Sequence, residues 1–117
     1  MPRVEAIEPQ PEMWVTLKDE NLPVYTTRSL PPRRTAQPEY PKEEKAKKIS
    51  GEALIYVLVD VKGEPVEATI KRSLPSSAFG EAAKKAVLKW RFQPVKTDGK
   101  PTRYLIQTPV VFTVLDD

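Results

Sequence analysis

The stretch 88-LKWRFQPVKTDGKP-101 places two large aromatic rings at the end of a lysine-rich segment. Immediately upstream, apolar residues recur at the spacing of one helix face. These residues are Phe79, Ala82, Ala83, Ala86, Val87 and Trp90. Pro94 ends this pattern because proline cannot continue a helix, and 97-TDGKP-101 is typical of a turn. We therefore predict a helix over 79–90 whose apolar face, with Phe92, covers one side of a sheet.

Three strand-like segments accompany this helix. The run 53-ALIYVLV-59 is rich in β-branched residues, and 66-VEATIK-71 alternates apolar with polar residues, as half-buried strands do. The turn-like 60-DVKGEP-65 joins them, so we predict a β-hairpin over 53–71. The apolar segment 103-RYLIQTPVVFTVL-115 predicts a long final strand.

A short helix is predicted before the hairpin. Pro41 suits the first turn of a helix, acidic residues precede basic ones in 42-KEEKAKK-48, and Gly51 ends the segment. The element order is then α-β-β-α-β. It predicts an α+β fold, a three-stranded antiparallel sheet with two helices on one face. The residues assigned to its core are Tyr40, Phe79, Ala83, Val87, Trp90, Phe92 and Phe112.

Composition changes sharply near residue 37. Eight of the 13 prolines lie before residue 42, whereas all four glycines lie after it. Proline fixes φ and biases the preceding residue toward extended backbone. We therefore predict that 1–36 is an extended, strand-poor arm and that 37–117 is the folded domain. One island in the arm, 12-EMWVTL-17, has the composition of a strand.

The composition excludes several classes of function. The 117 residues include no His and no Cys, which removes the commonest general base, the thiol nucleophile and most zinc ligands. We therefore expect no enzyme activity, no metal and no cofactor. The net charge is +3, but charges of both signs are interspersed, which favours a solvated surface over a nucleic-acid-binding one. Because the sequence contains neither a long apolar run nor a signal-peptide pattern, we expect a soluble chain.

Several short motifs resemble the C-terminal domain of TonB. They lie in 37-QPEYPKEEKAKKISGEALIYVLVDVKGEPVEATIKRS-73, in 82-AAKKAVLKWRFQP-94 and in 109-PVVFTVL-115. The marks are Gln-Pro-x-Tyr-Pro before the first helix, Ile-x-Gly before the first strand, Trp-Arg-Phe-x-Pro after the second helix, and Pro-x-x-Phe in the last strand. They occur in the family's order over 37–117, whereas 1–36 lies outside the resemblance.

The resemblance implies a periplasmic, receptor-binding domain of a Gram-negative energy transducer. In that family, an inner-membrane helix couples the transducer to a proton-driven motor. The C-terminal domain grips the TonB box of outer-membrane transporters that take up iron complexes and vitamins. This sequence contains no such membrane helix, so the anchor is expected in a segment not present here.

The grip implied by the resemblance is β-strand addition, in which an edge strand offers unpaired N–H and C=O groups to an extended chain. Carried onto this sequence, the partner-binding residues are Gln37, Thr102, Arg103, Tyr104, Leu105, Ile106, Gln107 and Thr108. Pro109 lacks a donor and is expected to end the pairing. A further hypothesis is that the island 12–17 occludes this edge, within one chain or between two. A loosely docked linker is the preferred interpretation of that island.

Other functional interpretations stay open. The same fold can act as a homodimerising envelope scaffold without a transporter partner, because edge strands of two copies can pair. Nucleic-acid binding is disfavoured, since the sequence shows no solvent-facing aromatic pair on a strand. An enzyme is the weakest interpretation, because the sequence contains no phosphate-binding loop and no metal-ligand cluster.

Overall fold

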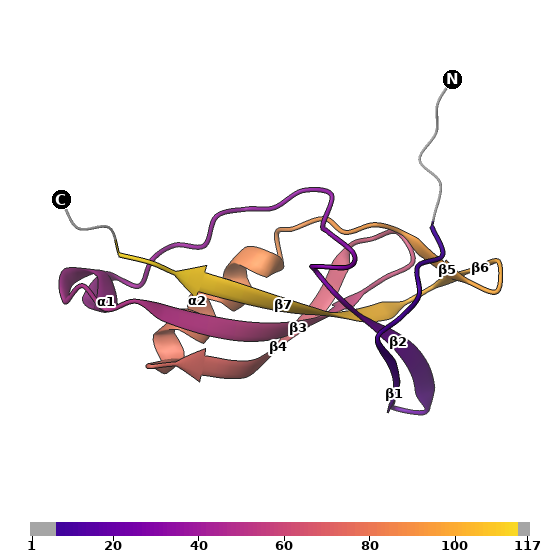
Figure 1. Cartoon of the computed structure of the whole chain (residues 1–117), viewed down its shortest axis with the longest axis horizontal. Coiled ribbons are helices and arrows are strands. Elements are labelled where there is room, and N and C mark those ends of the chain that lie inside the picture. Colours follow the sequence, from indigo (N-terminus) through magenta and orange to yellow (C-terminus); the bar gives the residue numbers. More distant parts are fainter. Residues whose placement is uncertain (1–6, 115–117) are drawn as a thin grey trace, which may run out of the picture.

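The computed structural model of the chain describes residues 7–114 (Figure 1). Its elements are β1 (Met13–Leu17), β2 (Glu20–Thr26), α1 (Lys42–Ala46), β3 (Gly51–Val59), β4 (Pro65–Leu74), α2 (Ser77–Val87), β5 (Val95–Thr97), β6 (Lys100–Thr102) and β7 (Tyr104–Phe112). Residues 1–6 of the predicted arm and residue 115 of the predicted final strand lie outside the described residues.

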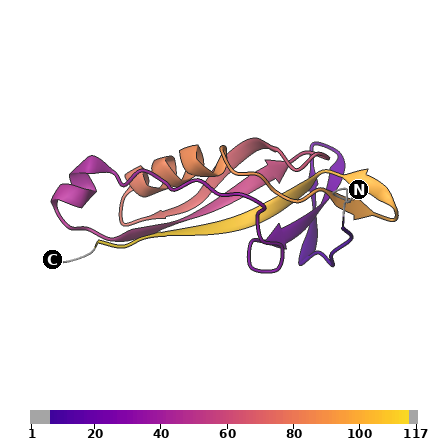
Figure 2. The ribbon, with the colours of Figure 1, turned by 90° about the horizontal axis from the view of Figure 1, so that it is seen from above.

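The main sheet has five strands in the order β1-β2-β7-β3-β4, and β5 pairs with β6 separately. Helix α2 lies across one face of this sheet, and α1 lies at its end (Figure 2). The predicted α+β class is confirmed. The predicted three-stranded, all-antiparallel sheet is corrected, because the arm adds two strands and β2 runs parallel to β7.

The arm is not strand-poor, contrary to the prediction. Residues 13–26 form a β-hairpin closed by Lys18 and Asp19, whose φ angles of 50° and 66° are those of a two-residue hairpin turn. The hairpin joins the sheet because β2 buries Leu22, Val24 and Tyr25. This apolar contribution outweighs the extended-linker tendency of the surrounding prolines.

The main core fills the space between the sheet and α2. Of the residues assigned to it from the sequence, Phe79, Ala83, Val87, Phe92 and Phe112 are buried there. Tyr40 and Trp90 are half-buried and pack against its surface. The ring of Tyr40 lies edge-on to Phe79 and Phe112, with centroids 5.9 and 5.6 Å away. It thereby closes the end of the core near α1.

The Trp-Arg-Phe stretch ties three segments together. Helix α2 continues as a tight turn, in which the Trp90 amide donates to the Val87 carbonyl at 3.1 Å. The Trp90 Nε1 donates to the carbonyl of Ala36 at 2.9 Å. The Phe92 amide donates to the carbonyl of Gly63, in the β3–β4 turn, at 2.8 Å. The aromatic pair is therefore scaffolding that joins the arm, α2 and the hairpin.

A smaller apolar cluster lies on the opposite face of the sheet. It contains Leu22 and Val24 from β2, Leu58 from β3 and Leu105 from β7, with Val15 of β1 against it. Two of its four buried members come from the arm, so the arm hairpin completes this second cluster.

Candidate functional site

Strand β7 contains the predicted partner-binding edge, and the structure places strands on both sides of it. β3 pairs with β7 along Tyr104–Phe112, whereas β2 pairs only with Leu105–Gln107. The Thr27 amide donates to the Gln107 carbonyl at 3.1 Å. Because alternate residues of a strand direct their backbone groups to the same edge, Leu105, Gln107 and Pro109 all face the β2 side.

Two prolines limit the contact between β2 and β7. Pro23 directly precedes Val24, the first paired residue of β2, and Pro109 lies two positions after Gln107, the last paired residue of β7. Neither proline has an N–H to donate to a facing strand. The pairing therefore covers only three residue pairs, and side chains must supply much of its strength.

The side chains of β2 supply that strength on both faces of the sheet. Tyr25 is 1% exposed, and its hydroxyl donates to the Pro9 carbonyl at 3.3 Å. Leu22 and Val24, on the other face, are also 1% exposed. Complete burial of such a side chain contributes roughly 1.5–3 kcal/mol. Strand β2 is thus an integral part of the sheet.

The occlusion hypothesis is therefore corrected in one respect. A segment of the arm does occupy the edge of β7, but it is β2 and not the island 12–17. The island forms β1, which pairs with the far side of β2 in antiparallel register. The sequence signal that identifies β2 is the apolar run in 20-ENLPVYT-26, which Pro23 interrupts.

The other predicted partner-binding residues differ in their surroundings. Thr102 ends β6, and Arg103 forms an ion pair with Glu20 at 3.6 Å. Gln107 is half-buried, and its Nε2 donates to the hydroxyl of Tyr56. Tyr104, Leu105, Ile106 and Thr108 are buried. Of the predicted residues, Leu105, Ile106 and Gln107 lie in the part of β7 that already has β2 beside it.

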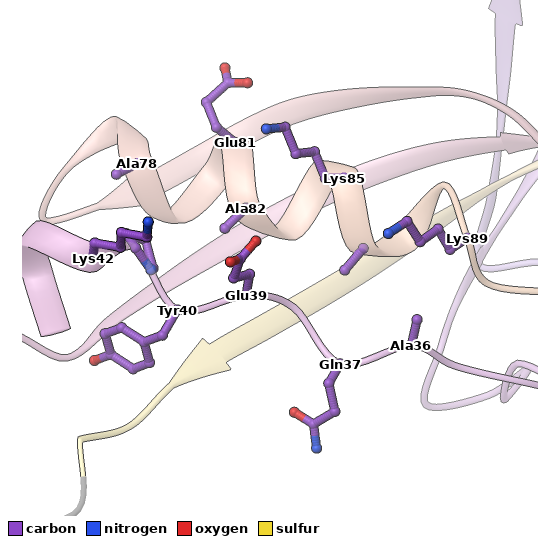
Figure 3. A pocket seen from close by; sticks show the side chains of 12 residues that line it. Ala36, Gln37, Glu39, Tyr40, Lys42, Ala78, Glu81, Ala82, Lys85 and Lys89 are labelled. Atoms are coloured by element: carbon purple, nitrogen blue, oxygen red, sulfur yellow. The ribbon is translucent and has the colours of Figure 1, made fainter.

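Gln37 lies on the extended segment 36–41, which runs beside α2. Its side chain is exposed and points away from that helix (Figure 3). Between this segment and α2 lies a groove of about 640 Å³. Alanines of α2 line the groove, and positively charged lysines and negatively charged glutamates surround them. This mixed-charge rim does not select a ligand of one charge.

Among residues 7–114, the titratable groups with perturbed pKa values are two buried tyrosines, Tyr25 and Tyr104. Burial away from water is the main cause of the raised pKa of Tyr104, and the nearby Tyr25 raises this pKa further. The hydrogen bond from the Tyr104 hydroxyl to the Gln93 carbonyl, 2.7 Å long, acts in the opposite direction. Desolvation also raises the pKa of Tyr25. Both phenols therefore stay neutral near pH 7 and act as packing groups.

The described part of the chain, 7–114, contains no cluster of three or more acidic, His or Cys side chains suited to a metal ion. Within the same residues, no helix is long and apolar enough to cross a membrane. The remaining candidate for a binding site is an edge of the sheet, whose outermost strands are β1 and β4. Sequence reasoning missed that β1 is an edge, because it did not place β2 between β1 and β7.

Comparison with known proteins agrees with the fold. A model of the Gram-negative bacterial TonB protein C-terminal matches residues 36–114. The chain is 28% identical over 76 residues to Protein TonB of Vibrio cholerae and 33% identical over 75 residues to Protein tonB2 of Pseudomonas aeruginosa. These alignments cover 65% and 64% of this chain but 31% and 28% of the relatives. The chain thus spans less than a third of the length of these two relatives.

Solved structures show the same relationship. The solution NMR structure of the Pseudomonas aeruginosa TonB CTD superposes with a TM-score of 0.62 and 25% identity, over 75% of this chain and 89% of that one. The TonB2 protein of Vibrio anguillarum gives a TM-score of 0.56 over 73% and 81% of the two chains. At 23% identity, this second likeness supports the fold alone. Since the family model spans residues 36–114, the chain belongs to the TonB C-terminal domain family.

Proposed function

We propose that this domain engages outer-membrane transporters in the periplasm. It binds an extended N-terminal segment of the transporter by β-strand addition and transmits force from a proton-driven motor of the inner membrane. The transported substrates are of the kind that need active uptake, such as iron complexes and vitamins. The observation that carries the proposal is a TonB-type fold whose sheet, within residues 7–114, ends in an uncharged edge strand, β1, that pairs on one side only.

The chemistry of this function is binding rather than catalysis. An added strand is held mainly by backbone hydrogen bonds, each worth about 1 kcal/mol net. Such bonds need no ionisable side chain, which agrees with a sequence free of His and Cys. Side chains beside the edge then select which extended segment fits.

The edge of β7 at Thr102–Thr108, implied by the family resemblance, is available only if β2 leaves it. Release of β2 would expose Leu22, Val24 and Tyr25, which are now buried. At roughly 1.5–3 kcal/mol for each side chain, this step costs several kcal/mol. A partner that binds there must offset that loss with its own contacts.

Isothermal titration calorimetry with synthetic peptides from transporter N-termini tests the proposed function. We expect saturable binding, lost when the peptide is scrambled or when proline replaces a residue of its pairing segment. Absence of binding at millimolar peptide would overturn the proposal. If the chain bound no peptide but dimerised reversibly in sedimentation experiments, the homodimerising scaffold would become the better interpretation.

A further inference from the structure

We infer that the partner strand adds to the outer edge of β1, not to β7. This inference rests on the proposed function and identifies where in the sheet that function resides. The arm hairpin covers β7 with β2 and presents β1 as the new edge of the same sheet (Figure 1).

Within the part of the chain that the structure describes, no strand pairs with the outer side of β1, which has the free backbone groups that strand addition needs. A two-residue hairpin turn closes on a hydrogen-bonded pair, here Leu17 with Glu20. Because bonded and non-bonded pairs alternate in an antiparallel ladder, Val15 and Leu22 are bonded as well. The N–H and C=O groups of Trp14 and Thr16 therefore point away from β2, toward the free side of the sheet.

The side chains of β1 leave that edge unprotected. The strand, MWVTL, contains no charged residue and no proline. Met13, Trp14 and Leu17 are 52%, 46% and 38% exposed. Soluble proteins usually protect an edge with charge, proline or a bulge, so an edge without these devices is a ready template for another strand.

The opposite edge of the same sheet, β4, shows those protective devices. Pro65 begins β4. The register between β3 and β4 shifts twice, at Leu54/Ile55 and at Leu58/Val59 of β3. The exposed charged residues of β4 are Glu67, Lys71 and Arg72. The β4 edge thus has features that disfavour strand addition, whereas the β1 edge lacks them.

The rest of the β7 edge is a poorer template. Beyond Gln107, the first residue facing that side is Pro109, which has no N–H. The next is Val111, so a strand added there meets one donor in this stretch. The edge of β1 offers two donors, from Trp14 and Thr16. Unlike the stretch Leu105–Gln107, it is not covered by β2, so no strand has to be displaced.

The partner that fits β1 is an extended peptide of about five residues, the length of this strand. It carries apolar or β-branched side chains beside Trp14 and has no proline at its paired positions. A second copy of the chain fits less well. Two five-residue strands, each about 17 Å long, would pair along a short edge and bury little surface. Stable dimers bury at least about 1,200 Å² of surface.

The test is an amide-resolved NMR titration of the full chain with a transporter N-terminal peptide. Two variants at one position serve as a matched pair. Thr16→Ala keeps the outward N–H, whereas Thr16→Pro removes it without removing a donor of the β1–β2 ladder. We expect shifts centred on Trp14 and Thr16, an affinity within twofold for Thr16→Ala, and at least tenfold weaker binding for Thr16→Pro. Unchanged amide shifts of Leu22 and Val24 will show that the hairpin of Thr16→Pro is intact.

Each other outcome has a distinct meaning. Shifts centred on Leu105 and Gln107, or equal affinities of the two variants, would overturn the β1 site but leave the proposed function standing. Shifts at β1 that depend on protein concentration and not on peptide would assign the edge to a second copy and overturn the inference. If no amide shifts at millimolar peptide, the proposed function itself fails.

Discussion

The ring of Tyr25 lies edge-on to the ring of Tyr104, with centroids 5.3 Å apart and planes at 88°. Tyr25 belongs to the arm and Tyr104 to the segment matched by the family model. Edge-to-face aromatic pairs contribute about 0.5–1.5 kcal/mol beyond their burial. This contact therefore joins the arm hairpin to the TonB-type domain, and it is the first place to test whether the arm is structural.

Replacement of Tyr25 by alanine removes this contact. We expect Tyr25→Ala to lower the free energy of unfolding by about 3–5 kcal/mol, as for other buried aromatic residues. Urea denaturation monitored by circular dichroism measures the change. Trp14→Ala is the control, because Trp14 is an aromatic residue of the same hairpin that is 46% exposed. If both variants lost the same small amount, the arm would be loosely docked after all.

Stability should fall at high pH because of the two buried tyrosines. Burial raises the pKa of Tyr104 and Tyr25 above the ordinary value of about 10. Below about pH 9 both the folded and the unfolded chain keep these phenol protons, so the two tyrosines do not reduce the free energy of unfolding there. Above about pH 10 the unfolded chain loses protons that the folded chain retains, and stability falls by up to about 1.4 kcal/mol per pH unit for each tyrosine.

The variant Tyr104→Phe isolates one share of this pH dependence. Urea unfolding at about pH 8 and about pH 11 should show a smaller loss for the variant than for the parent chain, because phenylalanine has no proton to release. At about pH 8 the variant should also be about 1 kcal/mol less stable, since it lacks the hydrogen bond to the Gln93 carbonyl. Parallel pH profiles would show that Tyr104 is not the group responsible.

Gly63 and Gly99 provide a matched pair for the junction with Phe92. Both have positive φ angles, +87° and +77°. A Cβ atom at Gly63 would lie 2.3 Å from the Phe92 carbonyl oxygen, whereas a Cβ at Gly99 would have no atom within 4 Å. We expect Gly99→Ala to cost about 1 kcal/mol from backbone strain and Gly63→Ala more than about 2 kcal/mol. Equal losses in thermal unfolding would mean that the close approach to Phe92 is not important.

The TonB-type part of the fold could be predicted because its signals are local. The apolar stripe from Phe79 to Trp90 identified a helix, and the alternation in 66–71 identified a strand. Helix α2 is shorter than the predicted 79–90 at its C-terminus, because its last turn tightens to the i+3 bonds of Lys89 and Trp90. Helix ends often tighten in this way, and the periodicity of the side chains does not reveal it.

The place of the arm could not be predicted, for two physical reasons. Leu22 and Val24 face one side of the sheet and Tyr25 the other, so β2 lacks the alternation that identifies a half-buried strand. Its parallel pairing with β7 also joins residues about 80 positions apart, and no local propensity specifies such a contact. The site proposed at β1 could not be predicted for the same reason, because β1 is the outermost strand only when β2 lies between it and β7.

The outer edge of β1 is the place where we propose that an outer-membrane transporter adds a strand to this sheet. Amide hydrogen exchange of the chain, measured by NMR with and without an intact transporter in detergent, tests this placement. The amides of Trp14 and Thr16 point away from β2, so we predict rapid exchange in the free chain that slows at least tenfold in the complex, while exchange of Thr69 on β4 stays unchanged. Exchange that is unaltered at Trp14 and Thr16 under saturating transporter would contradict the claim.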